Sequence, residues 1–302
     1  MPKAPTTSTS RRCSWPSRRA SEPSAPRCPA PVLISLVVTT YNRPDALRAV
    51  LDGLSAQVDR GFEVLVADDG SGDDTRAVVT ASSANSPVPT EHVWQEDRGF
   101  RAGAARNRAA ARAQGEYLIF IDGDCIARPD FIAQHRALAE PGWMVAGNRI
   151  LLSEAFTHRA LADRWPLHEW RLDQWEIARR EGAINRSLPL MRLGLGPLRK
   201  LQARRWQRVR TCNLGLWRRD FETVNGFDEA YEGWGFEDSD LAVRLLNAGI
   251  RRKEGAFATG LLHLWHKEND RRFEASNQER LQARIASRDV RAAIGLAQYL
   301  PS

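Results

Sequence analysis

The sequence predicts an α/β fold in which a mostly parallel central sheet is flanked by helices. Apolar runs of strand length alternate with helical patterns through residues 32–124, the connections are short, and two of the runs end in aspartate clusters. A repeated strand–helix–strand order pairs its strands in parallel, because each helix returns the chain to the edge of the sheet where it began. With 302 residues, of which 42% are hydrophobic, the chain can bury a substantial core.

The first half supplies these elements in a regular order. A β-branched run at residues 32–38 has the composition of a buried strand, and Pro44 then fits the first turn of a helix. Apolar residues after Pro44 recur at helical spacing, and the turn-forming residues 68–72 close the second strand. We expect strands at 32–38, 62–67, 92–94 and 117–121, and helices at 44–54, 74–84 and 102–113.

The second half is less regular. Residues 155–180 are expected to form one long helical stretch that carries several aromatic residues. Strands are expected at 145–150 and 212–217, a helix from Glu237 to Ala248, and a polar C-terminal helix at 276–298. The apolar run at 32–38 is too short to span a bilayer, and the first thirty residues hold no apolar core of a secretory signal, so we expect a cytoplasmic protein.

The net charge of +7 is concentrated in two segments. Residues 1–30 carry six basic residues and one acidic residue in a Ser/Pro/Arg-rich composition that cannot offset its ordering entropy, so we expect a disordered basic tail. Residues 186–210 carry eight basic residues and no acidic residue. Neither segment is accompanied by an aromatic strand platform or a recognition-helix motif, so nucleic acid is not an expected partner.

The four cysteines give no metal-binding or disulfide pattern. None belongs to a Cys-x-x-Cys pair, and Cys13 and Cys28 lie in the basic tail. Cys125 and Cys212 lie in apolar, strand-like contexts. We therefore expect them to be structural thiols.

Pairs of aspartates follow two of the predicted strands. Asp68 and Asp69 come after the second strand, and Asp122 and Asp124, with Gly123 between them, come after the strand at 117–121. Parallel sheets bind ligands outside the carboxyl ends of their strands. Carboxylates gathered there repel one another unless a cation binds, and a hard divalent cation that carries diphosphate oxygens would satisfy them. The alternative for an isolated Asp-x-Asp is a solvated turn.

Two further groups in the second half carry chemistry. His263 and His266 are three residues apart and can aim two imidazoles at one point, a ligand type that suits Mn²⁺, although either alone could be a core histidine. Glu237 and Asp238 follow two glycines that flank Trp234, and they open a predicted helix. They are either capping acids or carboxylates at an acceptor site, where one could take the proton of an attacking hydroxyl.

These motifs, in this order, resemble two related groups of sugar transferases. Residues 32–124 resemble the nucleotide-binding half of family 2 glycosyltransferases, which have the GT-A fold, through Thr39-Thr40-Tyr41-Asn42-Arg43, Val66-Ala67-Asp68-Asp69-Gly70-Ser71, Ala104-Ala105-Arg106-Asn107-Arg108 and Asp122-Gly123-Asp124. Residues 211–266 resemble the C-terminal part of galactosyltransferases and polypeptide N-acetylgalactosaminyltransferases through Cys212-Asn213-Leu214-Gly215, Asn225-Gly226-Phe227-Asp228, Gly233-Trp234-Gly235-Phe236-Glu237-Asp238 and His266. One departure is Thr39, which stands where the family usually has proline.

The resemblance also implies an organisation of the chain. After the tail at 1–30, residues 31–150 would form a nucleotide-sugar-binding half and residues 151–210 a helical, basic insertion. Residues 211–275 would form the acceptor, metal and catalytic half of the same GT-A domain, and residues 276–302 a C-terminal helix.

The resemblance implies roles for the matching residues as well. The implied donor-binding residues are Thr40, Tyr41, Arg43, Asp68, Asp69, Arg106 and Asp122. Asp124 and His266, with His263 as a second histidine, would bind a divalent metal, Mn²⁺ or Mg²⁺. Trp234 and Glu237 would hold the acceptor, and Asp238, with Glu237 beside it, would be the catalytic base.

The expected function is therefore an inverting, metal-dependent transfer of a hexose or N-acetylhexosamine from a UDP-sugar to a glycan or lipid-linked glycan, in bacterial surface polysaccharide or lipopolysaccharide synthesis. The first alternative is a retaining GT-A transferase. Polypeptide N-acetylgalactosaminyltransferases carry asparagine where Asp238 stands, which favours inversion here. A remote alternative is a nucleic-acid-binding protein that uses the two basic segments.

The basic segment at 186–210 interleaves leucines with its cations. It is either a solvated insertion or a surface that lies on anionic lipid, where apolar groups enter the interface and each nearby cation adds about 1 kcal/mol. In the second case the protein would be peripheral on the inner face of the plasma membrane. Gly194, Gly196 and Pro197 predict two short helical pieces rather than one continuous helix.

Overall fold

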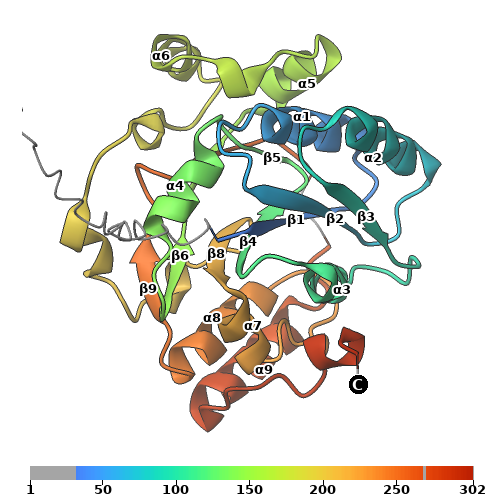
Figure 1. Ribbon diagram of the computed structural model, residues 1–302, viewed down its shortest axis with the longest axis vertical. Helices are drawn as coiled ribbons and strands as arrows, with labels where there is room; N and C mark the ends of the chain where they lie inside the picture. The colour runs from blue at the N-terminus through green and yellow to red at the C-terminus, as the bar shows by residue number, and fades with distance from the viewer. Residues whose placement is uncertain (1–31, 268–269, 302) are drawn as a thin grey trace, which may run out of the picture. The chain divides into compact units, whose positions relative to one another are not determined.

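A seven-stranded sheet runs through the middle of the structure and has helices on both of its faces (Figure 1). The computed structural model describes residues 32–267 and 270–301. The part of the chain from Val32 onward forms one compact unit. The basic tail expected at residues 1–30 lies outside the described residues.

Four parallel strands form one side of the sheet, and three further strands extend it. The parallel strands are β1 (Ile34–Thr40), β2 (Phe62–Asp68), β3 (Thr90–Trp94) and β4 (Tyr117–Asp122). β8 (Asn213–Trp217) is antiparallel to β4 and to β6 (Trp143–Ala146), and β6 is parallel to β9 (Arg251–Glu254). The strand order is β3-β2-β1-β4-β8-β6-β9. The predicted α/β fold with a mostly parallel sheet is confirmed.

Alternation along β1 explains why the sheet carries a layer of helices on each face. Every residue of β1 is buried. Leu36 and Val38 belong to one apolar cluster and Val37 to another, because successive side chains of a strand point to opposite faces. Helices α1 (Pro44–Ser55) and α2 (Asp73–Asn85) pack into the first cluster, and α3 (Ala102–Arg112) packs into the second.

The second half of the chain completes both layers and adds a small sheet. Helix α4 (Phe131–Leu138) contributes to the cluster of α1, whereas α7 (Arg218–Thr223) and α8 (Glu237–Asn247) contribute to that of α3. Helix α9 (Glu274–Ser287) packs on α8. The small sheet has the order β5 (Cys125–Ile126), β10 (Leu261–His263) and β7 (Arg149–Leu151).

The single strand predicted at 145–150 is wrong, because this segment forms two strands that belong to different sheets. β6 ends at Ala146 and β7 begins at Arg149. Between them, the N–H of Gly147 donates to the carbonyl oxygen of Asn213 at 2.8 Å. A Cβ on Gly147 would lie 2.2 Å from the Asn213 carboxamide, so only glycine fits at this turn.

The helix predicted over 155–180 is also divided. α5 (Glu154–Ala162) and α6 (Leu172–Arg180) are separated by a short irregular segment with one 3₁₀ turn, Leu167–Glu169. In this segment Arg164 has a φ of 52° and Pro166 follows it. A left-handed residue ends a helix, and proline lacks the N–H that would continue one.

The C-terminal helix expected within residues 276–302 is shorter than predicted. α9 begins at Glu274 and ends at Ser287, where Arg288 takes a φ of 58°. Beyond it the only helical piece in the described chain is a 3₁₀ turn, Leu296–Tyr299. The left-handed conformation of Arg288 breaks the i→i−4 hydrogen bonds that a longer helix would need.

The basic insertion contains short 3₁₀ turns between residues 186 and 210, in place of two helical pieces. These turns are Leu188–Leu190, Gly196–Lys200 and Trp206–Arg208. Pro189 and Pro197 lack the N–H of a helix interior, and Gly194 and Gly196 disfavour the helical conformation. Within residues 32–267 and 270–301, none of the helices is long and apolar enough to cross a membrane.

Candidate active site

The carboxyl ends of β1, β2 and β4 meet at one edge of the main sheet. Their parallel register places Thr40 beside Asp68 and Thr39 beside Asp122. The first-loop threonines and both predicted aspartate clusters therefore occupy neighbouring positions along this edge. Parallel α/β sheets bind their ligands at this kind of edge.

Asp68 holds the loops of this edge together from inside the fold. Its side chain is fully buried and accepts a hydrogen bond from the Ser71 N–H at 2.8 Å, while its other oxygen lies 2.8 Å from Nε2 of His92. Burial acts to raise the pKa of Asp68, but the hydrogen bonds from His92 and Ser71 outweigh burial, so the pKa lies below its usual value. Asp68 therefore positions these loops, and its expected contact with the donor stays a prediction.

Asp69 is also buried, at 3% exposure. Its carboxylate accepts hydrogen bonds from Nε2 of Gln95 and from the N–H of Arg101, each at 2.6 Å. Burial raises the pKa of Asp69, although both hydrogen bonds oppose this effect. An ionised carboxylate has about four acceptor positions, so Asp69 stays a candidate for the nucleoside.

The first loop presents its three candidate residues differently. The hydroxyl of Thr40 is buried and has no hydrogen-bond partner among the described residues. Tyr41 is 48% exposed and donates its hydroxyl to Asp97 at 2.9 Å. Arg43 is partly exposed, and its Nε donates to Asp45 at 3.1 Å. Tyr41 and Arg43 are therefore accessible from solvent, whereas Thr40 is buried.

Arg106 joins the N-terminal half of the site to α8. Its guanidinium, 6% exposed, donates to Oγ1 of Thr39 at 2.9 Å and to Oδ1 of Asp122 at 3.0 Å. A third contact reaches Oε1 of Glu237 at 3.4 Å. Burial acts to lower the pKa of Arg106, but the carboxylates around it, led by Asp122, raise it above its usual value. Arg106 therefore stays charged between the two halves.

Gly123 allows the chain after β4 to follow a close-packed path. Its N–H donates to the Thr39 carbonyl oxygen at 2.7 Å. A Cβ at this position would lie 2.9 Å from the same oxygen, so any other residue would push the loop away. The chain then leaves the main sheet and delivers Asp124 to the start of β5.

Asp124, His263 and His266 converge on one point from two distant parts of the chain. Nε2 of His263 lies 3.7 Å from Oδ1 of Asp124, and Nε2 of His266 lies 3.5 Å from Oδ2. One ligand atom from each of the three lies within 4.8 Å of the others. Pairing of β10 with β5 causes this approach, because His263 lies opposite Cys125, the residue after Asp124.

This donor set fits a divalent metal ion. Nδ1 of His266 lies 2.9 Å from the carbonyl oxygen of Lys267, a contact that orients the ring so that Nε2 faces Asp124. Burial lowers the pKa of His263, which keeps that imidazole neutral and able to bind metal. Two imidazoles and one carboxylate suit Mn²⁺ or a similar ion.

Glu237 and Asp238 begin α8 and lie close to Arg106. Oδ1 of Asp238 accepts a hydrogen bond from the Ser239 N–H at 3.1 Å. Burial and the neighbouring Asp238 raise the pKa of Glu237 to about 7, against the opposing effect of Arg106. A buried carboxyl whose pKa is raised in this way is typical of functional sites.

A buried ion-pair network fixes the start of α8. Arg244 pairs with Asp240 one turn away at 2.7 Å, and both side chains are fully buried. Arg284 of α9 reaches Asp240 at 3.0 Å and Asp228 at 2.8 Å. Carboxylates and guanidinium groups that are buried together in this way hold their elements in one arrangement. The positions of Glu237 and Asp238 therefore depend on side chains from α9.

Asn107, the neighbour of Arg106 on α3, ties this network to the first half. Its Nδ2 donates to the Phe227 carbonyl oxygen at 2.9 Å, and its Oδ1 accepts from the Phe227 N–H at 2.8 Å. The backbone of the Asn225-Gly226-Phe227-Asp228 motif therefore binds α3, and the side chain of Asp228 pairs with Arg284 of α9.

Trp234 lies between two glycines at the start of this region. Gly233 and Gly235 have φ values of 66° and 114°, which other residues rarely adopt. The ring of Trp234 lies 5.0 Å from the guanidinium carbon of Arg271. A Cβ on Gly233 would lie 2.4 Å from the ring of Phe273, so this turn is tightly packed. Trp234 is partly exposed, as an acceptor-binding side chain must be.

Sequence reasoning missed Arg149. This residue lies on β7 beside Leu261 of β10, and its Nη1 is 3.6 Å from Sγ of Cys212. Burial acts to lower the pKa of Arg149, but Cys212, Cys125 and Asp122 raise it above its usual value. No acidic residue of the described chain forms an ion pair with it. No local motif surrounds Arg149, and only the pairing of β7 with β10 could have revealed it.

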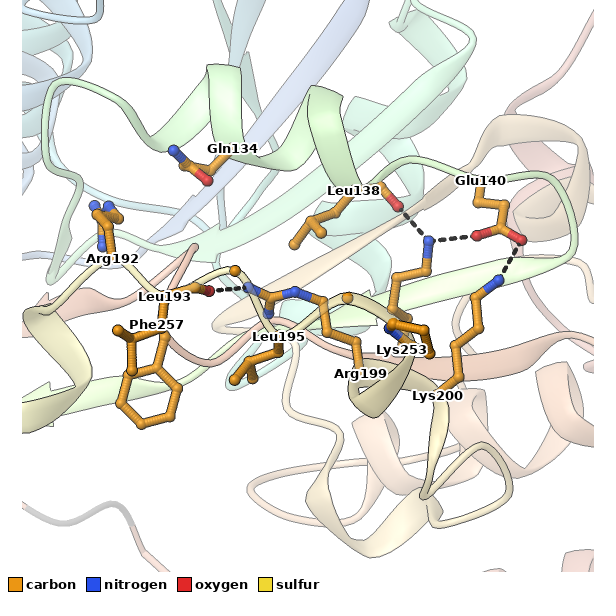
Figure 2. A pocket seen from close by; sticks show the side chains of 13 residues that line it. Gln134, Leu138, Glu140, Arg192, Leu193, Leu195, Arg199, Lys200, Lys253 and Phe257 are labelled. Atoms are coloured by element: carbon orange, nitrogen blue, oxygen red, sulfur yellow. Dashed lines mark hydrogen bonds and ion pairs between the residues drawn. The ribbon is translucent and has the colours of Figure 1, made fainter.

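A separate cavity of about 600 Å³ lies beneath the basic insertion, next to α4 and β9 (Figure 2). Its cations already have partners. Lys200 and Lys253 bind the two oxygens of Glu140 at 2.7 and 2.6 Å. Arg199 donates to the Leu193 carbonyl oxygen at 3.0 Å. None of the candidate site residues lines this cavity, so it does not belong to the candidate active site.

Comparison with known proteins confirms the family resemblance of both halves of the chain. A family model described as glycosyl transferase family 2 matches residues 35–190. A second model, described as the N-terminal domain of galactosyltransferase, matches residues 200–267. The two matches follow one another along the chain and together span the candidate site.

Curated relatives include transferases of several kinds. Validoxylamine A glucosyltransferase of Streptomyces hygroscopicus subsp. jinggangensis (strain 5008) is 34% identical over 226 residues, which is 72% of this chain and 52% of that protein. O-antigen biosynthesis protein RfbC of Myxococcus xanthus is 29% identical over 252 residues, which is 80% of this chain and 18% of that protein. The chain therefore spans about half, or less, of the length of these relatives.

Solved structures show the same fold at low identity. Mannosyltransferase PcManGT from Pyrobaculum calidifontis, in complex with GDP-Man and Mn²⁺, gives a TM-score of 0.56 at 19% identity, over 86% of this chain and 66% of that chain. S. aureus TarS 1–349 in complex with UDP gives a TM-score of 0.57 at 15% identity, over 88% of this chain and 68% of that chain. These likenesses confirm the predicted GT-A fold.

Proposed function

Because the chain belongs to glycosyl transferase family 2, we propose that it is an inverting, metal-dependent glycosyltransferase. The donor is a UDP-sugar that carries a hexose or an N-acetylhexosamine, and the acceptor is a glycan or a lipid-linked glycan. The relative named for O-antigen biosynthesis supports a place in bacterial surface polysaccharide synthesis.

The observation that carries this proposal is the convergence of three motifs at the end of β4. Asp124 meets His263 and His266, while Asp122 is joined through Arg106 to Glu237. Arg106 thus connects a donor-side and an acceptor-side carboxylate, and the metal set adjoins the first of them along the chain. A sugar transfer needs these three functions next to one another.

The chain's own residues divide the work between donor and acceptor. Asp124, His263 and His266 would hold the divalent ion, which supplies positive charge to the diphosphate leaving group. Arg149 forms no ion pair with an acidic residue among the described residues, and we assign its positive charge to the same diphosphate. Trp234 and Glu237 bind the acceptor, and Asp238 takes the proton from its attacking hydroxyl.

Inversion is expected if the carboxylate at the start of α8 acts as a base and the acceptor oxygen is the only nucleophile, because a single displacement inverts the anomeric carbon. The carboxylate of Asp238 takes the hydroxyl proton while the acceptor oxygen attacks the anomeric carbon and the bond to the diphosphate breaks. A retaining transferase would give the opposite anomer. Proton NMR of the fresh product separates the two, and a product with the anomeric configuration of the donor would overturn inversion.

A donor screen tests the proposal as a whole. UDP-sugars and GDP-mannose are incubated with the protein and Mn²⁺, and release of nucleoside diphosphate is measured with and without acceptors. Acceptors should include a surface-glycan fragment and validoxylamine A, since a relative is named for that compound. We expect metal-dependent turnover of a UDP-sugar. Exclusive use of GDP-mannose would overturn the donor assignment.

The basic insertion is proposed to place the enzyme on anionic lipid. Five large apolar side chains between residues 186 and 210 are exposed, namely Leu188, Met191, Leu193, Leu198 and Leu201. Arg204, Arg205 and Arg208 are exposed and have no acidic partner within the described residues. Apolar groups beside unpaired cations fit a surface that binds anionic membranes peripherally, close to a lipid-linked acceptor.

A further inference from the structure

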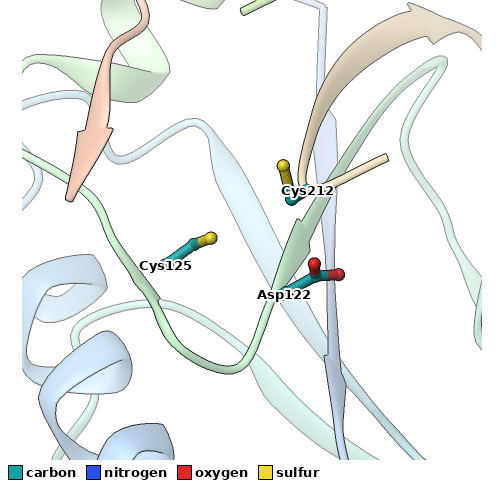
Figure 3. Close-up of side chains that lie close together, drawn as sticks. All are labelled: Asp122, Cys125 and Cys212. Carbon is teal, nitrogen blue, oxygen red and sulfur yellow. The ribbon is translucent and has the colours of Figure 1, made fainter. Parts of the chain in front are cut away.

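Two buried thiols lie close to Asp122, as Figure 3 shows, and Cys125 directly follows the proposed metal ligand Asp124. Cys125 is in β5 and fully buried, and Cys212, just before β8, is 4% exposed. One ligand atom from each of Asp122, Cys125 and Cys212 lies within 4.8 Å of the others. The two thiols come from distant parts of the sequence, so no Cys-x-x-Cys motif or other local pattern predicted that they would meet.

We propose that Asp122, Cys125 and Cys212 form a second metal site, which selects a soft divalent cation such as Zn²⁺ or Cd²⁺. Thiolate sulphur prefers these ions over Mn²⁺ and Mg²⁺. Zinc binds thiolate at about 2.3 Å and carboxylate at about 2.0–2.2 Å, so ligand atoms already this close need only small side-chain shifts to surround an ion. Solvent would complete the tetrahedron.

The surroundings of the three ligands balance the charge of such a site. Each thiol gives its proton to solvent as its sulphur binds, and no oxidation occurs. Two thiolates and the carboxylate of Asp122 then face the divalent cation and the guanidinium of Arg149, whose Nη1 is 3.6 Å from Sγ of Cys212. The divalent cation, Arg149 and Arg106, which also binds Asp122, therefore compensate the negative charge of the ligands, as a largely buried site requires.

An entry path is also present. The side chain of Asp122 is 31% exposed, unlike the thiols behind it. Only its Oδ1 is bound by Arg106, which leaves Oδ2 to receive an arriving ion. The ion would therefore be captured at the rim by a carboxylate and held inside by sulphur.

The two clusters share the short segment from Asp122 to Cys125, and this has a functional consequence that rests on the proposed function. A soft ion held by Oδ2 of Asp122 competes with the donor for that carboxylate and weakens its pairing with Arg106. It also pulls on the loop that carries Asp124. We therefore expect Zn²⁺ or Cd²⁺ to inhibit an enzyme that Mn²⁺ activates, from a site beside the activating metal.

Direct binding is measured with Cd²⁺ alone, by the ultraviolet charge-transfer absorption of cadmium–thiolate bonds. The protein carries Cys13→Ser and Cys28→Ser, so that only the two buried thiols contribute. We expect one equivalent of Cd²⁺ to saturate the signal. Cys125→Ser and Cys212→Ser, or the corresponding alanine variants if serine perturbs folding, should each lose most of it. His266→Ala should retain it, because its imidazole belongs to the other cluster.

No absorption on saturation with Cd²⁺, or a signal that survives the double Cys125→Ser and Cys212→Ser change, would overturn the site. Inhibition is a separate readout at excess Mn²⁺. We expect Cd²⁺ to lower turnover roughly tenfold or more in the parent but not in Cys212→Ser. Equal inhibition of both would place the inhibitory ion elsewhere. A protein that binds Cd²⁺ through its thiols but turns over no nucleotide sugar would sink the proposed function and leave this site standing.

Discussion

The two edges of the candidate site are built in different ways. The donor edge, at the carboxyl ends of β1, β2 and β4, is set by backbone pairing, which places Thr39 beside Asp122 and Thr40 beside Asp68. The acceptor edge, made by residues 233–238 and the start of α8, contains no strand. It is held by side chains, above all by the ion pairs of Asp240 and Arg284.

The difference teaches where each kind of damage should appear. Backbone hydrogen bonds in a parallel sheet survive most side-chain changes, so substitutions on the donor edge should act locally, on the group that was removed. The acceptor edge depends on a few buried ion pairs, and losing one partner leaves an uncompensated charge. Distant substitutions should therefore displace the acceptor edge and leave donor binding intact.

The largest effect should come from substitution of the proposed metal ligands, which lie between the two edges. Replacing Asp124 or His266 by alanine should lower Mn²⁺-dependent turnover by roughly three orders of magnitude or more, because the diphosphate loses its charge stabilisation. Turnover is measured across a range of Mn²⁺ concentrations, with thermal unfolding as the control for folding. Full activity of His266→Ala at every concentration would show that the ligand assignment is wrong.

His263→Ala should have a smaller or metal-specific effect. Its side chain is more buried than that of His266, at 10% against 34% exposure, and part of its role is to pack β10. We expect activity to recover partly at high Mn²⁺ and not to recover equally with Mg²⁺, since imidazole favours the softer ion. A loss as complete as that of His266→Ala would make the two histidines equivalent ligands.

Asp238→Asn tests the acceptor edge alone. Loss of a positioned proton acceptor should lower turnover by roughly 10²- to 10⁴-fold. The affinity for UDP and Mn²⁺, measured by calorimetry, should hardly change, because the donor edge is untouched. If Asp238→Asn loses UDP binding as well, the residue faces the nucleotide or supports the fold.

Arg284→Gln tests whether α9 positions the acceptor edge from a distance. We expect turnover to fall roughly 10- to 100-fold through misplacement of the groups at the start of α8, with UDP affinity unchanged. Arg284→Lys should restore part of the activity, because an ammonium can still pair with Asp228 or Asp240. Equal losses of turnover and UDP affinity would contradict the independence of the two edges.

Glu237→Gln should change how activity depends on pH. The pKa of Glu237, about 7, means that its carboxylate is protonated at lower pH, so the parent should lose acceptor kcat/KM as pH falls through 7. The variant should have lower activity at pH 8 and a flatter profile below it. A parent profile without any change near pH 7 would remove Glu237 from acceptor binding.

The same ionisation should affect stability in the opposite sense. An unfolded glutamate has a pKa of about 4.3, so between that value and 7 the folded protein binds a proton that the unfolded chain lacks. The contribution of the protonated form is fully present below pH 4.3 and is lost as pH rises through 7. Glu237→Gln should therefore be more stable than the parent at pH 8, by roughly 1–3 kcal/mol in denaturant unfolding.

The smallest effect on chemistry should come from the basic insertion. Changing Arg204, Arg205 and Arg208 to glutamate should weaken co-sedimentation with anionic vesicles and leave turnover of a soluble acceptor unchanged. The matched control changes the exposed Arg76, Arg159 and Arg280, which lie on α2, α5 and α9 and outside residues 186–210. Equal pelleting with neutral and anionic vesicles, or no pelleting, would overturn the proposed membrane-binding surface. Residues 186–210 would then be a solvated insertion.

Prediction from the sequence succeeded where local patterns are strong. The strands of the first half were expected within a few residues, because buried parallel strands appear as continuous apolar runs and their ends carry turn residues. It failed at 145–150, where the close approach of Gly147 to Asn213 divides one apolar run between two sheets. It failed again at Arg164 and Arg288, whose positive φ angles end helices without a glycine to signal them.

The sequence by itself determined the order of the strands and helices through β4, the α/β class and the candidate groups Asp122, Asp124, Glu237 and Asp238. It could do so because hydrophobic period and turn chemistry act over a few neighbouring residues. Only the tertiary structure decided that Asp68 faces inward, that Arg149 reaches the site, and that Cys125 meets Cys212. Those outcomes depend on which strands pair across the small sheet and the main sheet, and pairing between distant segments is settled by the packing of the whole fold, which no local pattern contains.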